Sequence, residues 1–245
     1  MKKVKRKTSA KKEVAVEKRI KTGIPGLDEV MAGGFENNSV NLVSGGAGTG
    51  KSIFAMQFIV NGIKEFNEPG VFVTFEEEKE KIQKHMLKMG WDLKKLEAEK
   101  KLVVIQYTPE QVKKMMDEGG GEVELEISKI KAKRVVIDSL TAFSLLFKEG
   151  LARREALLDL FKIIGRWGCT ALLVGEHESD VERHQSRDVE FEVDGIILLY
   201  YLRKGDTRNR ALEILKLRGS KHSTRIFPMK ITDNGIKIYP DEAVF

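Results

Sequence analysis

Short apolar runs alternate along the chain with longer stretches that have the spacing of amphipathic helices. The apolar runs predict strands at Ser39–Ser44, Val71–Phe75, Leu102–Gln106, Arg134–Asp138, Ala171–Val174 and Ile196–Leu202. The helical spacing predicts helices at Lys51–Phe66, Glu78–Met89 and Leu151–Trp167. Because strands that alternate with helices of this length form βαβ units, we expect an α/β fold with a mostly parallel, twisted sheet flanked by helices.

The pattern changes in the C-terminal third of the chain. Polar and apolar residues alternate in three runs, at Ala211–Leu217, Arg225–Ile231 and Ile236–Tyr239. The turn sequences Arg218-Gly219-Ser220 and Asp233-Asn234-Gly235 separate these runs, so we expect C-terminal antiparallel strands at the edge of the sheet. The segment His177–Asp194 is polar and has no clear periodicity, which predicts an exposed loop.

A glycine-rich segment lies between the first predicted strand and the first predicted helix. From Gly45 to Ser52 it satisfies the P-loop pattern G-x-x-x-x-G-K-[ST]. Glycines let the backbone N–H groups wrap around phosphates, Lys51 would reach the β- and γ-phosphates, and Ser52 would ligate Mg²⁺. The strand before it and the helix after it argue against a chance glycine-rich turn. The candidate ATP-binding residues in and next to this segment are Gly45, Gly46, Ala47, Gly48, Thr49, Gly50, Lys51, Ser52 and Ile53.

Asp138 follows the predicted buried strand that begins at Arg134. A carboxylate at the C-terminal end of such a strand suits the Walker B role, in which it orients Mg²⁺ and its water ligands. An aspartate after a strand is also common at turns. With a P-loop in the same chain, we favour the magnesium role.

Glu76 and Glu77 end another predicted strand, at the sheet edge where parallel strands place their ligands. ATP hydrolysis needs a group that orients or deprotonates the attacking water, and a glutamate can do this. Acidic residues in the first turn of a helix can also complement the helix macrodipole. The spacing of these residues leaves both interpretations open.

The basic charge of the chain is concentrated at its N-terminus. Nine Lys or Arg and two Glu occur in residues 1–19, so this segment has a net charge of +7. The whole chain has a net charge of +6, so the remaining residues carry −1. We expect residues 1–18 to form a disordered basic tail, and residues 19–245 to form one domain. A tail of this kind could instead contact nucleic acid through its phosphates.

Composition narrows the class of protein further. No apolar run reaches the roughly 18–20 residues that span a membrane, and no apolar segment follows the basic N-terminus as in a secretory signal. The chain contains a single cysteine, Cys169, which predicts a buried thiol and a cytoplasmic location. The charged content of 33% weakly indicates a thermophilic source.

From about Arg19 to Pro240, the sequence resembles the KaiC family of RecA-like ATPases, which includes archaeal single-domain members. The stretches that carry the resemblance are the P-loop, Thr22–Asp28, Gly70–Glu77, Gly90–Leu93, Ile137–Ser139, Leu212–His222 and Ile231–Asp233. The resemblance implies a RecA-like P-loop NTPase core, and a hexameric ring with Mg·ATP bound between neighbouring subunits.

The same resemblance assigns roles to individual residues. Glu76 and Glu77 match a pair of catalytic glutamates, while Lys216 and Arg218 match residues that reach the nucleotide of the neighbouring subunit. The further positions that match nucleotide contacts are Ser220, His222, Thr232 and Asp233. If the strand continues, positions 214, 216, 218 and 220 share one face, so the two cations project together. Two solvated cations on a sheet edge are the alternative.

Two departures limit what the resemblance implies. The clock ATPase of this family has two such domains in tandem and a tail with autophosphorylation sites, whereas this chain has one domain and no evident tail of that kind. Ser139 and Thr141, next to the Walker B strand, are therefore interpreted as structural.

His177, Glu178 and His184 do not have the spacing of a zinc signature.

The leading hypothesis is a slow, regulatory Mg·ATP-dependent ATPase that forms a homo-oligomeric ring, whose nucleotide-dependent shape an unidentified protein partner recognises. The first alternative is a recombinase-like DNA-binding protein. The seven acidic residues in His177–Asp194 argue against it, because an acidic channel would repel phosphates. The second alternative is a non-enzymatic scaffold that ATP holds together.

Overall fold

A computed structural model of the chain describes residues 19–147, 150–176 and 188–244. The strands are β1 (Arg19–Ile20), β2 (Phe35–Glu36), β3 (Val40–Gly45), β4 (Gly70–Thr74), β5 (Leu102–Gln106), β6 (Arg134–Asp138), β7 (Thr170–Glu176), β8 (Gly195–Lys204), β9 (Thr207–Leu217), β10 (Ile226–Thr232) and β11 (Gly235–Ile238). Nine of them form one sheet in the order β11-β10-β9-β8-β3-β7-β6-β4-β5, and β1 pairs with β2. Neighbours from β8 to β5 are parallel, whereas β8 to β11 pair antiparallel, as the sequence predicted.

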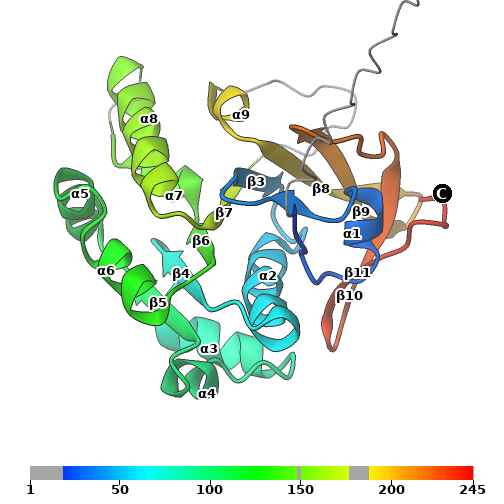
Figure 1. Cartoon of the computed structure of the whole chain (residues 1–245). Coiled ribbons are helices and arrows are strands. Elements are labelled where there is room, and N and C mark those ends of the chain that lie inside the picture. Colours follow the sequence, from blue (N-terminus) through cyan, green and yellow to red (C-terminus); the bar gives the residue numbers. More distant parts are fainter. Residues whose placement is uncertain (1–18, 148–149, 177–187, 245) are drawn as a thin grey trace, which may run out of the picture.

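Helices cover both faces of this sheet (Figure 1). They are α1 (Leu27–Val30), α2 (Lys51–Phe66), α3 (Lys79–Leu87), α4 (Leu93–Ala98), α5 (Pro109–Asp117), α6 (Gly121–Ile130), α7 (Leu140–Leu145), α8 (Leu151–Arg166) and α9 (Asp188–Glu192). One face packs against a core that includes α2, α3 and α4, and the other against a core that includes α5, α6, α7 and α8.

Strand β4 shows how the apolar runs supply both cores. Phe72 belongs to the core on the α2 side, and its neighbours Val71 and Val73 belong to the core on the α8 side. Successive side chains of a strand point to opposite faces, so a strand covered on both sides must be apolar throughout. This explains why the central strands appear in the sequence as continuous apolar runs.

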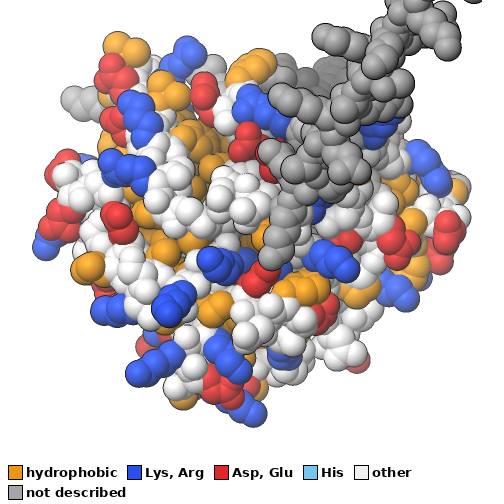
Figure 2. Space-filling view, in the orientation of Figure 1, with side chains coloured by type: hydrophobic (Ala, Val, Ile, Leu, Met, Phe, Trp, Pro, Cys, Tyr) orange, Lys and Arg blue, Asp and Glu red, His pale blue; other side chains and the backbone are white. Residues whose placement is uncertain are grey.

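The surface in Figure 2 has Lys and Arg side chains interspersed with Asp and Glu side chains, with no broad region of one sign. Within the described residues, none of the helices is long and apolar enough to cross a membrane. Cys169 is buried, as predicted, and burial raises the pKa of its thiol to about 11.

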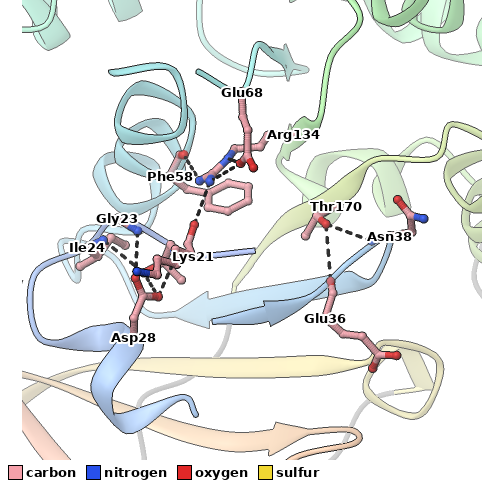
Figure 3. A network of polar contacts seen from close by, with 11 residues as sticks. Lys21, Gly23, Ile24, Asp28, Glu36, Asn38, Phe58, Glu68, Arg134 and Thr170 are labelled. Atoms are coloured by element: carbon pink, nitrogen blue, oxygen red, sulfur yellow. Dashed lines mark hydrogen bonds and ion pairs between the residues drawn. The ribbon is translucent and has the colours of Figure 1, made fainter. Parts of the chain in front are cut away.

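A fully buried arginine ties the N-terminal segment to the core (Figure 3). The guanidinium of Arg134 donates to the backbone carbonyls of Phe58 and Lys21, both at 2.8 Å, and pairs with the carboxylate of Glu68. It also lies over the Phe58 ring at 4.5 Å. Gly62 makes room for it, because a Cβ at that position would lie 2.3 Å from the Arg134 Nε atom. The chain at Lys21 is thereby fixed to α2 and β6.

The same N-terminal segment is ordered by its own polar contacts. The Asp28 carboxylate accepts hydrogen bonds from the backbone N–H and the hydroxyl of Thr22, each at 2.8 Å. Further along, the Thr170 hydroxyl accepts a hydrogen bond from the backbone N–H of Asn38 at 3.1 Å (Figure 3). These hydrogen bonds fix the segment before β3, the strand that leads to the P-loop.

Most predicted elements are present, and the bounds of Lys51–Phe66, Leu102–Gln106 and Arg134–Asp138 are as predicted. The predicted helix to Met89 ends at Leu87, shortly before Gly90 takes a left-handed conformation with φ 73°. The short helices α1, α4 and α7 were not predicted, because four to six residues are too few to show a helical period.

The predicted exposed loop His177–Asp194 is wrong over its last part. Asp188–Glu192 forms α9, and Glu190 and Val193 are buried. Val193 joins the core on the α8 side and Val189 packs against that core, so residues four apart share one helical face. Polar residues between them hid this signal in the sequence. Residues 177–187 of the predicted loop lie outside the described residues.

Candidate functional site

The P-loop connects the end of β3 to the start of α2. Gly48 and Gly50 have φ of 74° and 104°, values that favour glycine because they need no Cβ. Gly45 is required for a different reason, since a Cβ there would lie 2.4 Å from the carbonyl oxygen of Leu199 in β8. Other residues at these three positions would therefore strain or block the loop. The loop ends at the N-terminus of a 16-residue helix. That end of a helix favours bound anions.

Side chains of the P-loop turn back onto the loop itself. The Lys51 ammonium donates to the Gly46 carbonyl at 3.0 Å, and the Thr49 hydroxyl donates to the same oxygen at 2.8 Å. Lys51 thus lies inside the loop that phosphates would occupy, and its charge is available to them. Ile53, which was predicted to contact nucleotide, lies in the first turn of α2 and packs against the core on that side.

Asp138 ends β6 close to Ser52, the P-loop residue predicted to bind magnesium. Burial raises the pKa of the Asp138 carboxyl to about 6, against the lowering effects of the Ser52 hydroxyl and the Lys51 ammonium. The nearby carboxylates of Glu76 and Glu77 also raise it. A hydroxyl and a carboxylate oxygen side by side are the hard donors that Mg²⁺ prefers. Among the described residues, no group of three or more His, Cys, Asp or Glu is arranged as a metal site. The two residues thus fit a magnesium ion that takes its remaining ligands from phosphates and water.

Glu76 and Glu77 lie in the bend between β4 and α3, at the same sheet edge as Asp138. Helix α3 begins at Lys79, so both residues precede its first turn, and the macrodipole does not explain them. Thr74 fixes the bend, because its hydroxyl accepts from the backbone N–H of Glu77 at 3.2 Å.

The two glutamates differ in their surroundings. The Glu77 carboxylate lies 3.2 Å from Nδ1 of His85 in α3, and its side chain is 32% exposed. Glu76 is exposed, and it has no hydrogen bond or ion pair with any other residue in the described part of the chain. A carboxylate without a partner can turn towards a water molecule near Asp138.

Thr232 and Asp233 follow Ile231, whose side chain lies next to the P-loop, since a Cβ on Gly50 would be 3.0 Å from it. Thr232 ends β10 and Asp233 lies in the turn that leads to β11, where the Thr232 hydroxyl donates to the Gly235 carbonyl at 2.8 Å. The hairpin is attached to α2, because the Gln57 side chain donates to the Ile236 carbonyl at 3.0 Å and accepts from its N–H at 2.6 Å.

Lys216 and Arg218 project together, as predicted, but towards α9. The Lys216 ammonium donates to the carbonyl of Glu190 at 2.9 Å, and Arg218 donates to the carbonyl of Phe191 at 2.8 Å. The Arg218 guanidinium also pairs with the Asp194 carboxylate at 3.0 Å. Burial, followed by the charge of Arg218, lowers the pKa of Lys216. Cations at the C-terminal end of a helix satisfy its free carbonyls.

The prediction that position 214 shares their face is wrong. Lys216 pairs with Ile196 and Ile214 pairs with Ile197, so a β-bulge at Leu215 interrupts the alternation. Ile214 is consequently buried in the core on the α2 side, while the two cations face α9. The regular alternation of the sequence gave no sign of the extra residue.

Ser220 and His222 lie with these cations at the end of the sheet opposite the P-loop. The carbonyl of Gly219 accepts from Arg19, and the N–H of Ser223 donates to the carbonyl of Val30, which holds this turn against the N-terminal segment. Among the described residues, Nδ1 of His222 is buried without a hydrogen-bond partner.

The predicted site residues therefore form two groups at opposite ends of the parallel strands. Asp194, which binds Arg218, also accepts from the N–H of Val40 at the start of β3, at 3.0 Å. The P-loop begins five residues later, at Gly45, which at a rise of about 3.3 Å per residue is roughly 16 Å away. The group around Arg218 does not reach the P-loop of its own subunit.

Further residues at the site were not singled out in the sequence. Arg210 of β9 donates to the carbonyl of Gly48 at 3.0 Å, and the two residues are 162 positions apart. His85 and Asp194 hold Glu77 and Arg218, respectively. These contacts join distant parts of the chain, and only the fold reveals them.

Comparisons with known proteins identify the family of the chain. The family described as "ATPase: KaiC" matches residues 20–243. A UPF0273 protein of Methanocaldococcus jannaschii is 38% identical over 93% of this chain and 98% of its own length. The circadian clock oscillator protein KaiC of Synechococcus elongatus is 38% identical over 91% of this chain, which spans 44% of that protein.

A solved structure is also similar. The crystal structure of a KaiC-like protein from Pyrococcus horikoshii aligns with a TM-score of 0.81 and 37% identity, over 91% of this chain and 99% of that one. The RecA-like fold, the P-loop between β3 and α2, and these matches together show that the chain belongs to the KaiC family of ATPases.

Proposed function

We propose that this protein binds Mg·ATP between neighbouring subunits of a homo-oligomeric ring and hydrolyses it slowly as a regulatory ATPase. The observation that carries the proposal is the separation of its two groups of site residues. The P-loop, Asp138 and the glutamates lie at one end of the parallel strands, and Lys216 and Arg218 lie at the other. A head-to-tail contact between identical subunits would bring the two ends together, and repetition of this contact closes a ring.

In this proposal the P-loop binds the phosphates, and Ser52 and Asp138 hold Mg²⁺. The ion would neutralise charge that develops on the phosphates. Glu76 or Glu77 orients the attacking water and accepts its proton. The exposed turn of Thr232 and Asp233 contacts the nucleotide of its own subunit.

The neighbouring subunit completes the site with Lys216, Arg218, Ser220 and His222. A cation supplied across an interface stabilises charge on the transferring phosphoryl group. Both cations have donors to spare, since an ammonium has three N–H donors and a guanidinium has five. They can therefore engage a phosphate while part of their contact with α9 persists. The ring size of six rests on the family resemblance.

A ring whose subunits share each nucleotide can report the nucleotide state through its shape. We infer that an unidentified protein partner recognises this shape. The mixed charges on the face in Figure 2 give a DNA-binding role no support from that side of the molecule.

The proposal is tested by light scattering with and without Mg·ATP, with phosphate release measured in the same samples. We expect a nucleotide-dependent oligomer and slow phosphate release in the wild type. The Lys216→Ala/Arg218→Ala variant should still bind ATP and lose most of its turnover. A monomer that hydrolyses ATP as fast as the oligomer would refute the interfacial site. Assembly without turnover would instead indicate a nucleotide-dependent scaffold.

A further inference from the structure

The β8–β9 hairpin contacts the P-loop at Gly48. Nε of Arg210 donates to the carbonyl oxygen of Gly48 at 3.0 Å. The Tyr201 ring lies against the same residue, since a Cβ on Gly48 would be 3.8 Å from that ring. The Arg210 guanidinium lies over the Tyr201 ring at 4.6 Å, so the ring also supports the arginine. Arg210 thus holds the Gly48 carbonyl, and the Tyr201 ring of the same hairpin lies beside this residue.

This contact determines which way the peptide between Gly48 and Thr49 faces. In a trans peptide, the carbonyl and the next N–H point in opposite directions. A carbonyl held by Arg210 therefore directs the Thr49 N–H away from the hairpin. In a P-loop, the backbone N–H groups bind the phosphates. Because Gly48 has φ of 74° and lacks a Cβ, its peptide could turn over easily without such a contact.

We propose that Arg210, supported by Tyr201, is a positioning residue that keeps the P-loop in its phosphate-binding shape. The inference rests on the proposed ATP binding at this loop and extends it to a hairpin that the P-loop pattern does not include. Arg210 acts on the nucleotide only through the Gly48–Thr49 peptide. Its removal should weaken binding of the nucleotide and leave the hydrolysis step at saturation nearly unchanged.

Arg208 provides a matched control. It lies two residues before Arg210 on β9, and its guanidinium also lies over the Tyr201 ring, at 5.4 Å. It is exposed, and among the described residues it makes no hydrogen bond to the P-loop. Arg208→Ala therefore removes the same charge and a similar ring contact without removing the bond to Gly48.

The experiment measures the Kd of Mg·ATP by calorimetry for the full chain and its variants, together with turnover at saturating ATP and the apo melting temperature. Because Arg210→Ala removes a charge-assisted hydrogen bond and the loop can partly relax to compensate, we expect it to raise Kd by roughly five- to twentyfold. Arg208→Ala should change Kd by less than about twofold. Arg210→Lys keeps a charged N–H donor and should recover part of the affinity. The apo melting temperature and the saturated turnover of these variants should stay near wild type.

The possible outcomes separate this inference from the proposed function. If the wild type binds Mg·ATP and Arg210→Ala binds it equally well, the inference is wrong and the proposed function stands. An Arg208→Ala variant as weak as Arg210→Ala would also overturn it, because net charge alone would then explain the loss. If the wild type binds no better than Lys51→Ala, both the proposed function and the inference fail.

Discussion

Asp138→Asn should stabilise the metal-free protein while it abolishes binding of Mg·ATP. Burial raises the pKa of the Asp138 carboxyl from 3.8 to about 6, so the folded protein holds this proton more tightly than the unfolded chain does. The stabilising effect of the proton is complete below pH 3.8 and is lost as the pH rises to about 6. At neutral pH the ionised carboxylate therefore destabilises the fold.

The size of this effect follows from the shift. A difference of about two pKa units corresponds to roughly 3 kcal/mol, because each unit is worth about 1.4 kcal/mol. Asparagine has nearly the same shape and carries no charge at any pH. We therefore expect Asp138→Asn to raise the free energy of unfolding by about 1–3 kcal/mol at pH 7, with the gain shrinking towards zero near pH 4.

Denaturant unfolding in the presence of a chelator, at a series of pH values from 4 to 8, measures this difference. Asp241→Asn, at an exposed position near the C-terminus, serves as the control and should show no comparable gain. With Mg·ATP present, the order should reverse, because only the wild type gains stability from the ligand. The electrostatic reasoning is refuted if Asp138→Asn is no more stable than the wild type at pH 7. It is also refuted if the difference in unfolding free energy between the variant and the wild type grows as the pH falls.

Three further predictions follow from the other contacts. Arg134→Ala should lower the free energy of unfolding by about 3–5 kcal/mol in equilibrium denaturation, because it leaves buried carbonyls and a carboxylate without their partner. A loss below about 1 kcal/mol would mean that the contacts of Arg134 do not hold the N-terminal segment to the core. Replacing Glu76 or Glu77 with Gln should leave the Kd of ATP within a fewfold of wild type, and the double variant should slow single-turnover hydrolysis by roughly 10²–10⁴-fold; wild-type turnover would remove both residues from catalysis. Asp194→Asn should release Arg218 and lower saturated turnover by about tenfold, as expected for a charge-assisted contact worth about 1.5–3 kcal/mol, with little change in the Kd of ATP. A change in Kd without a change in turnover would contradict the proposed role of Arg218 in the hydrolysis step.

The parts of the candidate site that depend on neighbouring residues could be predicted from the sequence. The P-loop was recognisable because eight consecutive positions must satisfy one backbone path, and Asp138 because a buried strand precedes it. The order of strands and helices was also predictable, since burial on both faces requires the continuous apolar runs seen in β4 and β6.

Contacts between distant parts of the chain were not predictable. The β-bulge at Leu215 inserts one residue without changing the local composition, so its effect on Ile214 is visible only in the paired strands. Helix α9 is too short and too acidic to show its apolar face. Arg134 appeared to be an ordinary charged residue at the start of a strand, but Glu68 and two carbonyls from other segments allow it to be fully buried. In each case, tertiary contacts outweigh the local pattern.

The central claim is that one active site needs residues from two subunits, and mixing two inactive variants tests it most directly. Lys51→Ala disables the P-loop and retains the two cations, whereas Lys216→Ala/Arg218→Ala retains the P-loop. In a randomly mixed ring with equal amounts of both, roughly a quarter of the interfaces would combine an intact P-loop with intact cations. We predict that phosphate release reappears on mixing, at up to about a quarter of the wild-type rate. If mixed oligomers form and no phosphate is released beyond that of the separate variants, the shared site does not exist.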